Sequence, residues 1–115
     1  MVDESIVRVD RRYLQALVER GIPAPHAVVF GSQATGRTHA WSDIDLLVVS
    51  PKYDAPRKRE DVNVLWHVAA FTDSRIEPIA VGERQYQEDD SSAVIEIARR
   101  KGQMVKLEEL GRSIE

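Results

Sequence analysis

The sequence predicts an α/β domain with a small mixed sheet of three to four strands flanked by helices. Three short apolar runs, at 27–30, 44–49 and 76–81, have the length and residue content of strands. Segments with helical periodicity lie before, between and after these runs, and this alternation is typical of α/β folds. A chain of 115 residues corresponds to one domain, which we expect to span 1–115.

Three segments have the apolar periodicity of helices. The first, 10–20, begins with Asp10, a suitable N-cap, and is followed by Gly21, a stop signal. Its apolar stripe consists of Tyr13, Leu14, Leu17 and Val18. The second segment, 57–71, has an apolar stripe made of Val62, Leu65, Trp66 and Ala69. The third segment covers 92–100, and its apolar residues are Val94, Ile95, Ile97 and Ala98.

Strand chemistry and turn residues predict the rest of the chain. The run 44–49 is apolar at nearly every position, which favours a strand buried on both faces. Pro78 has no N–H to donate, so the third strand is expected at a sheet edge or a bulge. Residues 31–42 are expected to form a turn, a short helix and a loop, and 51–56 a second loop. The apolar residues after 102 show no firm period.

Charge and composition exclude several classes of protein. Sixteen basic and 19 acidic residues give a net charge of −3, which argues against direct DNA binding through a basic surface. The chain has no Cys, so disulfide scaffolds, cysteine nucleophiles and thiolate metal sites are excluded. No apolar run approaches the roughly 20 residues that span a bilayer. Because the acidic N-terminus also lacks a signal core, we expect a cytoplasmic protein without a membrane partner.

Two acids open the second predicted strand. Asp43 and Asp45 are two positions apart, so in a strand both side chains would point to one face, about 7 Å apart at Cα. Like charges this close disfavour joint ionisation unless a cation lies between them. Carboxylate oxygens suit Mg²⁺, which completes its shell with water and substrate phosphates. The pair therefore predicts a metal site.

Gly31, Ser32 and Glu77 complete the candidate site. Gly31 lets the backbone approach a ligand, the Ser32 hydroxyl adds a donor, and N–H groups at a helix start bind anions. Glu77 is the only acid within the third apolar run. If that strand lies beside the second, Glu77 can face the two aspartates, bind metal and help to deprotonate an attacking hydroxyl. A phosphate-binding turn beside metal-binding carboxylates is typical of nucleoside triphosphate chemistry.

This spacing of glycine, serine and acids carries a resemblance to a known family. Gly31-Ser32, ten further residues, and then Asp43-Ile44-Asp45-Leu46 resemble the signature of the DNA polymerase β-like nucleotidyltransferases. Among these, the chain is most similar to the minimal nucleotidyltransferases called MNT or MntA-type antitoxins. The likeness covers nearly the whole chain, from the leading helix through the third acidic strand to the final helix.

The resemblance implies a polymerase β-like fold and the transfer of AMP from ATP with two Mg²⁺ ions. It implies that the catalytic and metal-binding residues are Asp43, Asp45 and Glu77. It likewise implies that the nucleotide-binding residues are Gly31, Ser32 and Ser42. Antitoxins of this kind are paired with a HEPN-domain toxin, a helical ribonuclease, which they neutralise by adding AMP to a tyrosine. We therefore expect a protein adenylyltransferase whose partner is such a toxin.

Two other functions stay open. The chain could be a catalytically weak nucleotide-binding module that neutralises its partner by binding alone. Many relatives carry Arg at the positions of Gln33 and Thr35, although Arg37, His39 or Lys52 could supply a cation here. A small-molecule nucleotidyltransferase is disfavoured, because no residues are left for an acceptor domain. The acceptor site is then expected on another polypeptide or on a second copy in a homo-oligomer.

Overall fold

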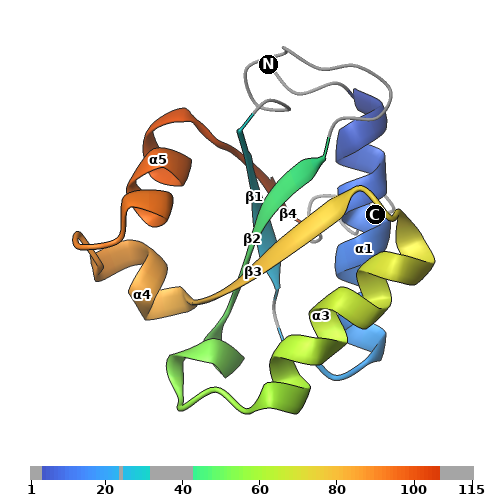
Figure 1. The fold of residues 1–115 in the computed structure, drawn as a ribbon, viewed down its shortest axis with the longest axis horizontal. Helices are drawn as coiled ribbons and strands as arrows, with labels where there is room; N and C mark the ends of the chain where they lie inside the picture. The colour runs from blue at the N-terminus through green and yellow to red at the C-terminus, as the bar shows by residue number, and fades with distance from the viewer. Residues whose placement is uncertain (1–3, 24, 32–42, 107–115) are drawn as a thin grey trace, which may run out of the picture.

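The computed structural model describes residues 4–23, 25–31 and 43–106 (Figure 1). The elements along the chain are α1 (Glu4–Glu19), β1 (His26–Phe30), β2 (Ile44–Ser50), η1 (Pro51–Asp54), α3 (Arg59–Thr72), β3 (Ile76–Gly82), α4 (Glu83–Glu88), α5 (Ala93–Lys101) and β4 (Gln103–Lys106). Of the turn, helix and loop expected at 31–42, everything after Gly31 lies outside the described residues. None of the described helices is long and apolar enough to cross a membrane.

The strands form one mixed sheet in the order β3-β2-β1-β4. Strand β1 is antiparallel to both β2 and β4, whereas β2 and β3 are parallel and are joined through η1 and α3. The mixed α/β fold with a four-stranded sheet confirms the predicted fold class. Strand β3 lies at the edge of this sheet, which is one of the two positions that the missing N–H of Pro78 predicted.

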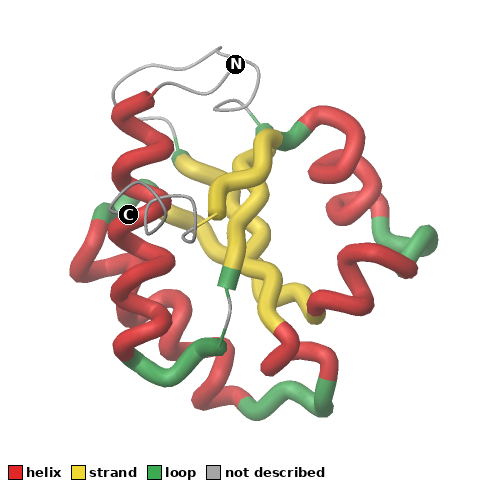
Figure 2. Tube along the Cα trace, turned by 180° about the vertical axis from the view of Figure 1, so that it is seen from behind, coloured by secondary structure: helices red, strands yellow, loops and turns green. Residues whose placement is uncertain are grey.

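Helices cover both faces of this sheet (Figures 1 and 2). Side chains alternate along β2, so that Ile44, Leu46 and Val48 belong to the apolar cluster under α1 and α3. Leu47 and Val49 point to the opposite face and pack with Ile95 and Ala98 of α5. Strand β2 is therefore buried on both faces, as its continuous apolar run predicted.

Helix α1 is longer than the sequence predicted. It begins at Glu4, so Asp10 is not an N-cap but lies inside the helix, and its side chain is completely buried. The apolar stripe of α1 includes Ile6, four residues before the predicted start, which the N-cap assignment had excluded. Trp66 of α3 was also placed on the buried stripe, but 50 % of its surface is exposed, and Val68 lies in the core instead.

The segment 51–56, expected as a loop, contains the short helix η1, and two further short elements, α4 and β4, were not predicted. Helix α4 follows β3 directly; the Gln85 side chain accepts the Gly82 N–H at 3.2 Å, and Asp54 of η1 accepts the Arg84 N–H at 3.0 Å. Strand β4 pairs with β1 from His26↔Lys106 to Val29↔Gln103. Both elements depend on contacts with distant segments, because an isolated six-residue helix or four-residue strand is not stable.

Candidate active site

Three strands bring the described candidate residues to one end of the sheet. Because β1 runs antiparallel to β2, Gly31 at the end of β1 lies near the start of β2, where Phe30 is paired with Asp45. Because β2 and β3 are parallel, their starts lie side by side, and Asp45 is paired with Glu77. Asp43 immediately precedes β2. We call the end that carries Gly31, Asp43, Asp45 and Glu77 the acidic end.

The carboxyl groups at the acidic end share one face of the sheet. Positions paired across neighbouring strands point to the same side, so Asp45 and Glu77 lie together. Leu47 and Val49, on the same face of β2, are covered by the cluster that includes α5. Asp45 is half-buried and Asp43 is exposed. This face of β2 is therefore covered by apolar side chains along most of the strand, and it is accessible to solvent at the end that carries the acids.

Proximity raises the pKa of two of the three acids. A hydrogen bond between the side chains of Glu77 and Asp43 raises the pKa of Glu77, and partial burial and the charges of Asp43 and Asp45 raise it further. Burial raises the pKa of Asp45, and the charge of Asp43 adds to this effect. The folded chain thus holds negative groups against their mutual repulsion, which a bound cation would relieve.

Gly31 determines how closely the β1 turn approaches Asp45. Its φ of +73° lies in the left-handed region that non-glycine residues rarely adopt. A methyl group placed on Gly31 would overlap the Oδ2 atom of Asp45 and lie 3.4 Å from its Cγ. The absence of a side chain therefore allows the carboxylate to lie directly against the backbone of the turn.

The donor chemistry of the acidic end fits a hard divalent cation. Three carboxyl groups offer only oxygen ligands, which is the set that Mg²⁺ prefers. Within the described ranges, however, no group of three or more His, Asp or Glu side chains is already arranged around a common metal position. Glu77 and Asp43 are instead hydrogen-bonded to each other.

A support for the acidic end was not predicted from the sequence. The turn before β3 is held by Asp73, whose carboxylate accepts the Arg75 backbone N–H at 2.9 Å and pairs with its guanidinium at 2.8 and 3.0 Å. The Arg75 carbonyl in turn accepts the Ile44 N–H at 2.8 Å. This turn fixes the starts of β2 and β3 together. In the sequence, the only sign of this support was an Asp placed two residues before an Arg, directly ahead of the third predicted strand.

Two candidate residues lie outside the described residues, namely Ser32 and Ser42. The same is true of Gln33, Thr35, Arg37 and His39, which the sequence placed around the phosphate-binding turn. Lys52 is described, and its Nζ lies 3.8 Å from the Asp61 carboxylate. Lys52 follows β2, at the opposite end of that strand from the acids, so it does not supply the cation there.

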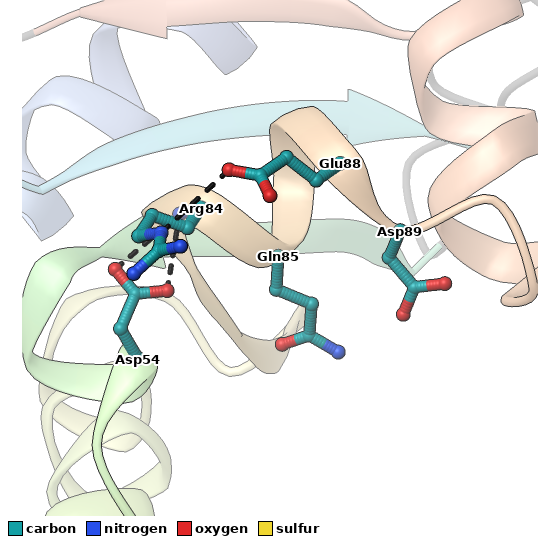
Figure 3. Close-up of a pocket in the computed structure, with 5 residues that line it drawn as sticks. All are labelled: Asp54, Arg84, Gln85, Glu88 and Asp89. Carbon is teal, nitrogen blue, oxygen red and sulfur yellow. Dashed lines mark hydrogen bonds and ion pairs between the residues drawn. The ribbon is translucent and has the colours of Figure 1, made fainter.

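A separate cavity of about 380 Å³ lies between η1 and α4 (Figure 3). It is lined by Asp54, Arg84, Gln85, Glu88 and Asp89. The Arg84 backbone N–H is bonded to Asp54, and its side chain lies 3.6 Å from Glu88 (Figure 3). Because η1 and α4 follow the ends of β2 and β3, this cavity is at the far end of the sheet from the acidic end.

The sheet and its acidic end define a class of protein: nucleotide-processing domains in which strand acids face a glycine turn. A family model for the nucleotidyltransferase domain matches residues 11–110, and the chain belongs to that family. No curated protein matches the sequence significantly.

Two solved structures share the fold. A candidate nucleotidyltransferase from Sulfolobus solfataricus is 20% identical, with a TM-score of 0.54 and coverage of 70% of each chain. A toxin–antitoxin structure with AMP-PNP is also 20% identical, with a TM-score of 0.55, and the match covers 83% of this chain and 71% of that one. At this identity the likeness establishes the fold alone.

Proposed function

We propose that the protein transfers AMP from ATP to a hydroxyl group of a partner protein, in a Mg²⁺-dependent reaction. The observation that carries the proposal is the meeting of Asp43, Asp45 and Glu77 on one face, with Glu77 hydrogen-bonded to Asp43. In the reaction, the acceptor oxygen bonds to the α-phosphorus of ATP, the bond to the β-phosphate oxygen breaks, and pyrophosphate leaves. The acceptor proton passes to a carboxylate, for which Glu77 or an aspartate is available.

The proposed roles follow from position. Asp43, Asp45 and Glu77 would hold two Mg²⁺ ions, which neutralise charge that develops on the phosphates. Gly31 would bring backbone N–H groups close to the phosphates, with help from Ser32 and Ser42. Burial and the neighbouring acids raise the pKa values of Asp45 and Glu77, so both groups hold a proton more readily than ordinary carboxyl groups, and a bound cation would oppose this effect.

We further propose that the partner is a toxin, specifically a HEPN-domain protein encoded by the neighbouring gene. The support is the likeness of fold to a protein solved as a toxin–antitoxin with AMP-PNP, together with the antitoxin-like signature of the sequence. An acceptor on a separate polypeptide also agrees with the exposed position of Asp43, which leaves the acidic end accessible to a large substrate.

The decisive experiment is transfer of label from α-³²P-ATP. The chain, Mg²⁺ and the neighbouring gene's product are incubated, and label on the product is measured by gel and mass spectrometry. Asp43→Asn with Asp45→Asn should lower transfer at least about 100-fold, because metal and phosphate positioning supply most of the catalysis. The matched control, Glu19→Gln with Asp90→Asn, removes two exposed acids on α1 and after α4 and should leave transfer unchanged.

A binding-only antitoxin is the second candidate. It is favoured by the hydrogen bond between Glu77 and Asp43, together with the lack, among the described residues, of three acids already grouped around one metal position. If the Asp43→Asn/Asp45→Asn variant neutralises the partner's ribonuclease activity as fully as the unchanged chain does, neutralisation is by masking. Absence of label on every tested partner, together with intact neutralisation, would also reject the transferase proposal.

A further inference from the structure

Helix α1 buries an acid that the proposed chemistry does not use. Asp10 is 0 % exposed, and Ile6, Tyr13 and Leu14, its neighbours one turn away on the same helix face, are buried with it. Among the residues that the structure describes, neither carboxyl oxygen of Asp10 has a hydrogen-bond partner. A buried, unpartnered carboxylate costs far more free energy than a neutral carboxylic acid in the same place.

The elements packed against α1 offer Asp10 little compensation. α1 contacts α3, β1 and β4. From β1 and β4 the apolar cluster on this side takes Ala27, Val29 and Val105. His26 and Lys106 occupy alternate positions, so they point to the other face of the sheet.

Tyr13 and α3 do not satisfy Asp10 either. The Tyr13 hydroxyl donates to the Leu65 carbonyl at 2.7 Å, which engages its proton. The residues of α3 in the core are Leu65, Val68 and Ala69, all apolar. Burial raises the pKa of Tyr13, and Tyr53 of η1 raises it further. The Tyr53 hydroxyl is also engaged, since it donates its proton to the Asp61 carbonyl at 2.8 Å.

The charges that act on the ionisation of Asp10 belong to the turn that supports the acidic end. Asp73 disfavours and Arg75 favours the ionisation of Asp10, and burial outweighs both. The Arg75 guanidinium is already paired with Asp73, 2.8 Å between Nη2 and Oδ2. The pair lowers the pKa of Asp73, and Arg12 of α1 assists, so Asp73 stays negatively charged. Because the positive charge of Arg75 is balanced by Asp73, it does little to stabilise a negative charge on Asp10.

We propose that Asp10 is a proton-dependent latch, which holds α1 against the core and the 73–75 turn only while its carboxyl group is neutral. Loss of the proton places a negative charge in an apolar contact beside Asp73, and α1 separates from that contact to hydrate it. The same turn accepts the Ile44 N–H and precedes Glu77 by two residues. Opening the latch therefore loosens the support of the acidic end.

The direction of the pH effect follows from the two states. Burial raises the pKa of Asp10 from 3.8 to about 8. Between these values the folded chain keeps a proton that the unfolded chain has lost, so stability falls as pH rises. One proton corresponds to about a tenfold fall in the folding equilibrium constant per pH unit, and the fall ends above the folded-state pKa.

Urea unfolding of the full chain, followed by circular dichroism across about pH 5 to 9, tests the latch. The compared variant, Asp10→Asn, keeps the shape but cannot ionise; Glu19→Gln removes an exposed acid from the same helix. Other titrating groups cancel in the ratio of folding constants, unchanged chain over Asp10→Asn. We expect this ratio to fall about tenfold per pH unit up to pH 7.5, and to stay flat for Glu19→Gln. A ratio independent of pH for Asp10→Asn overturns the proposal.

A second measurement needs no variant and no nucleotide. The carboxyl carbon of Asp10, observed by NMR in the unchanged chain, should titrate well above the ordinary aspartate value of 3.8. A midpoint near that value would refute the latch even if Asp10→Asn failed to fold. Hydrogen exchange, corrected for intrinsic base catalysis, should lose protection first in α1 and the 73–75 turn at high pH. Uniform loss across the sheet would instead indicate global unfolding and reject a local latch.

Discussion

At the scale of single residues, the acidic end depends on one backbone conformation. Gly31 adopts a φ of +73° and leaves space for the Oδ2 atom of Asp45. Gly21 also has a positive φ, of +92°, but a Cβ there would meet no atom of the described residues within 4 Å. A side chain at either position would strain the backbone, but only a side chain at position 31 would also collide with the Asp45 carboxylate. Comparing substitutions at Gly21 and Gly31 therefore distinguishes the effect of strain from the effect of the collision.

We expect Gly31→Ala to lose nucleotide transfer by at least about tenfold, because the added methyl group displaces a proposed metal ligand. Gly21→Ala should retain transfer, and both variants should lose about 1–2 kcal/mol of unfolding free energy through positive-φ strain. Label transfer and urea unfolding of the two variants make the comparison. Equal effects of both substitutions on transfer would show that strain alone is responsible.

At the scale of elements, α5 closes the face on which the acids stand. Its N-terminus is capped by Ser92, whose Oγ accepts the Ile95 N–H at 3.3 Å, and its last turn carries three cations, Arg99, Arg100 and Lys101. Both features complement the partial charges at the helix ends. Only Ile95 and Ala98 of α5 are buried, so the helix has little apolar contact with the sheet. The interactions at its two ends therefore contribute a large share of its stability.

We expect Ser92→Ala to lower the free energy of unfolding by about 1 kcal/mol, because the N-cap bond has no replacement. Ser91→Ala is the control: that hydroxyl donates to Asp89 at 2.8 Å in an exposed position, so the loss should be below about 0.5 kcal/mol. Chemical denaturation of both variants gives the difference. If the two losses are the same, the cap does not stabilise α5.

At the scale of the whole molecule, folding gathers charges that are far apart in the sequence. Asp43 and Glu77 lie 34 positions apart, yet they are hydrogen-bonded, and their proximity is possible only while β2 and β3 remain paired. A ligand that binds this cluster in the folded chain stabilises the sheet as a unit. When no cation is bound, repulsion among the acids destabilises the sheet.

We expect Mg²⁺ with a non-hydrolysable ATP analogue to raise the melting temperature, since ligand at 100 times its Kd adds about 2.7 kcal/mol of stability. The same analogue with EDTA should produce a much smaller rise. In the Asp43→Asn/Asp45→Asn variant the Mg²⁺-dependent part should vanish, while the melting temperature without ligand should not fall. Equal shifts with Mg²⁺ and with EDTA would argue against carboxylate-bound metal.

Local patterns were informative where one element's chemistry decides its structure. The apolar run of β2 indicated burial on both faces, and Pro78 indicated an edge strand or a bulge, because each reflects hydrogen bonding or packing of that strand alone. The N-cap assignment of Asp10 was wrong for the opposite reason. An acid before an apolar stripe is usually a cap, and only the packing of α1 against the sheet makes this one an internal, buried residue.

The sequence by itself determined the fold class, the three longer strands and the signature that leads to the nucleotidyltransferase family, because these depend on periodicity and on residue spacing. Only the tertiary structure decided that Glu77 lies beside Asp45, that Gly31 makes room for the Asp45 carboxylate, and that Asp10 has no hydrogen-bond partner in the described part of the chain. The physical reason is range. Hydrophobic periodicity is written in neighbouring residues, whereas the electrostatic environment of an acid is set by strands and turns that meet only when the chain folds.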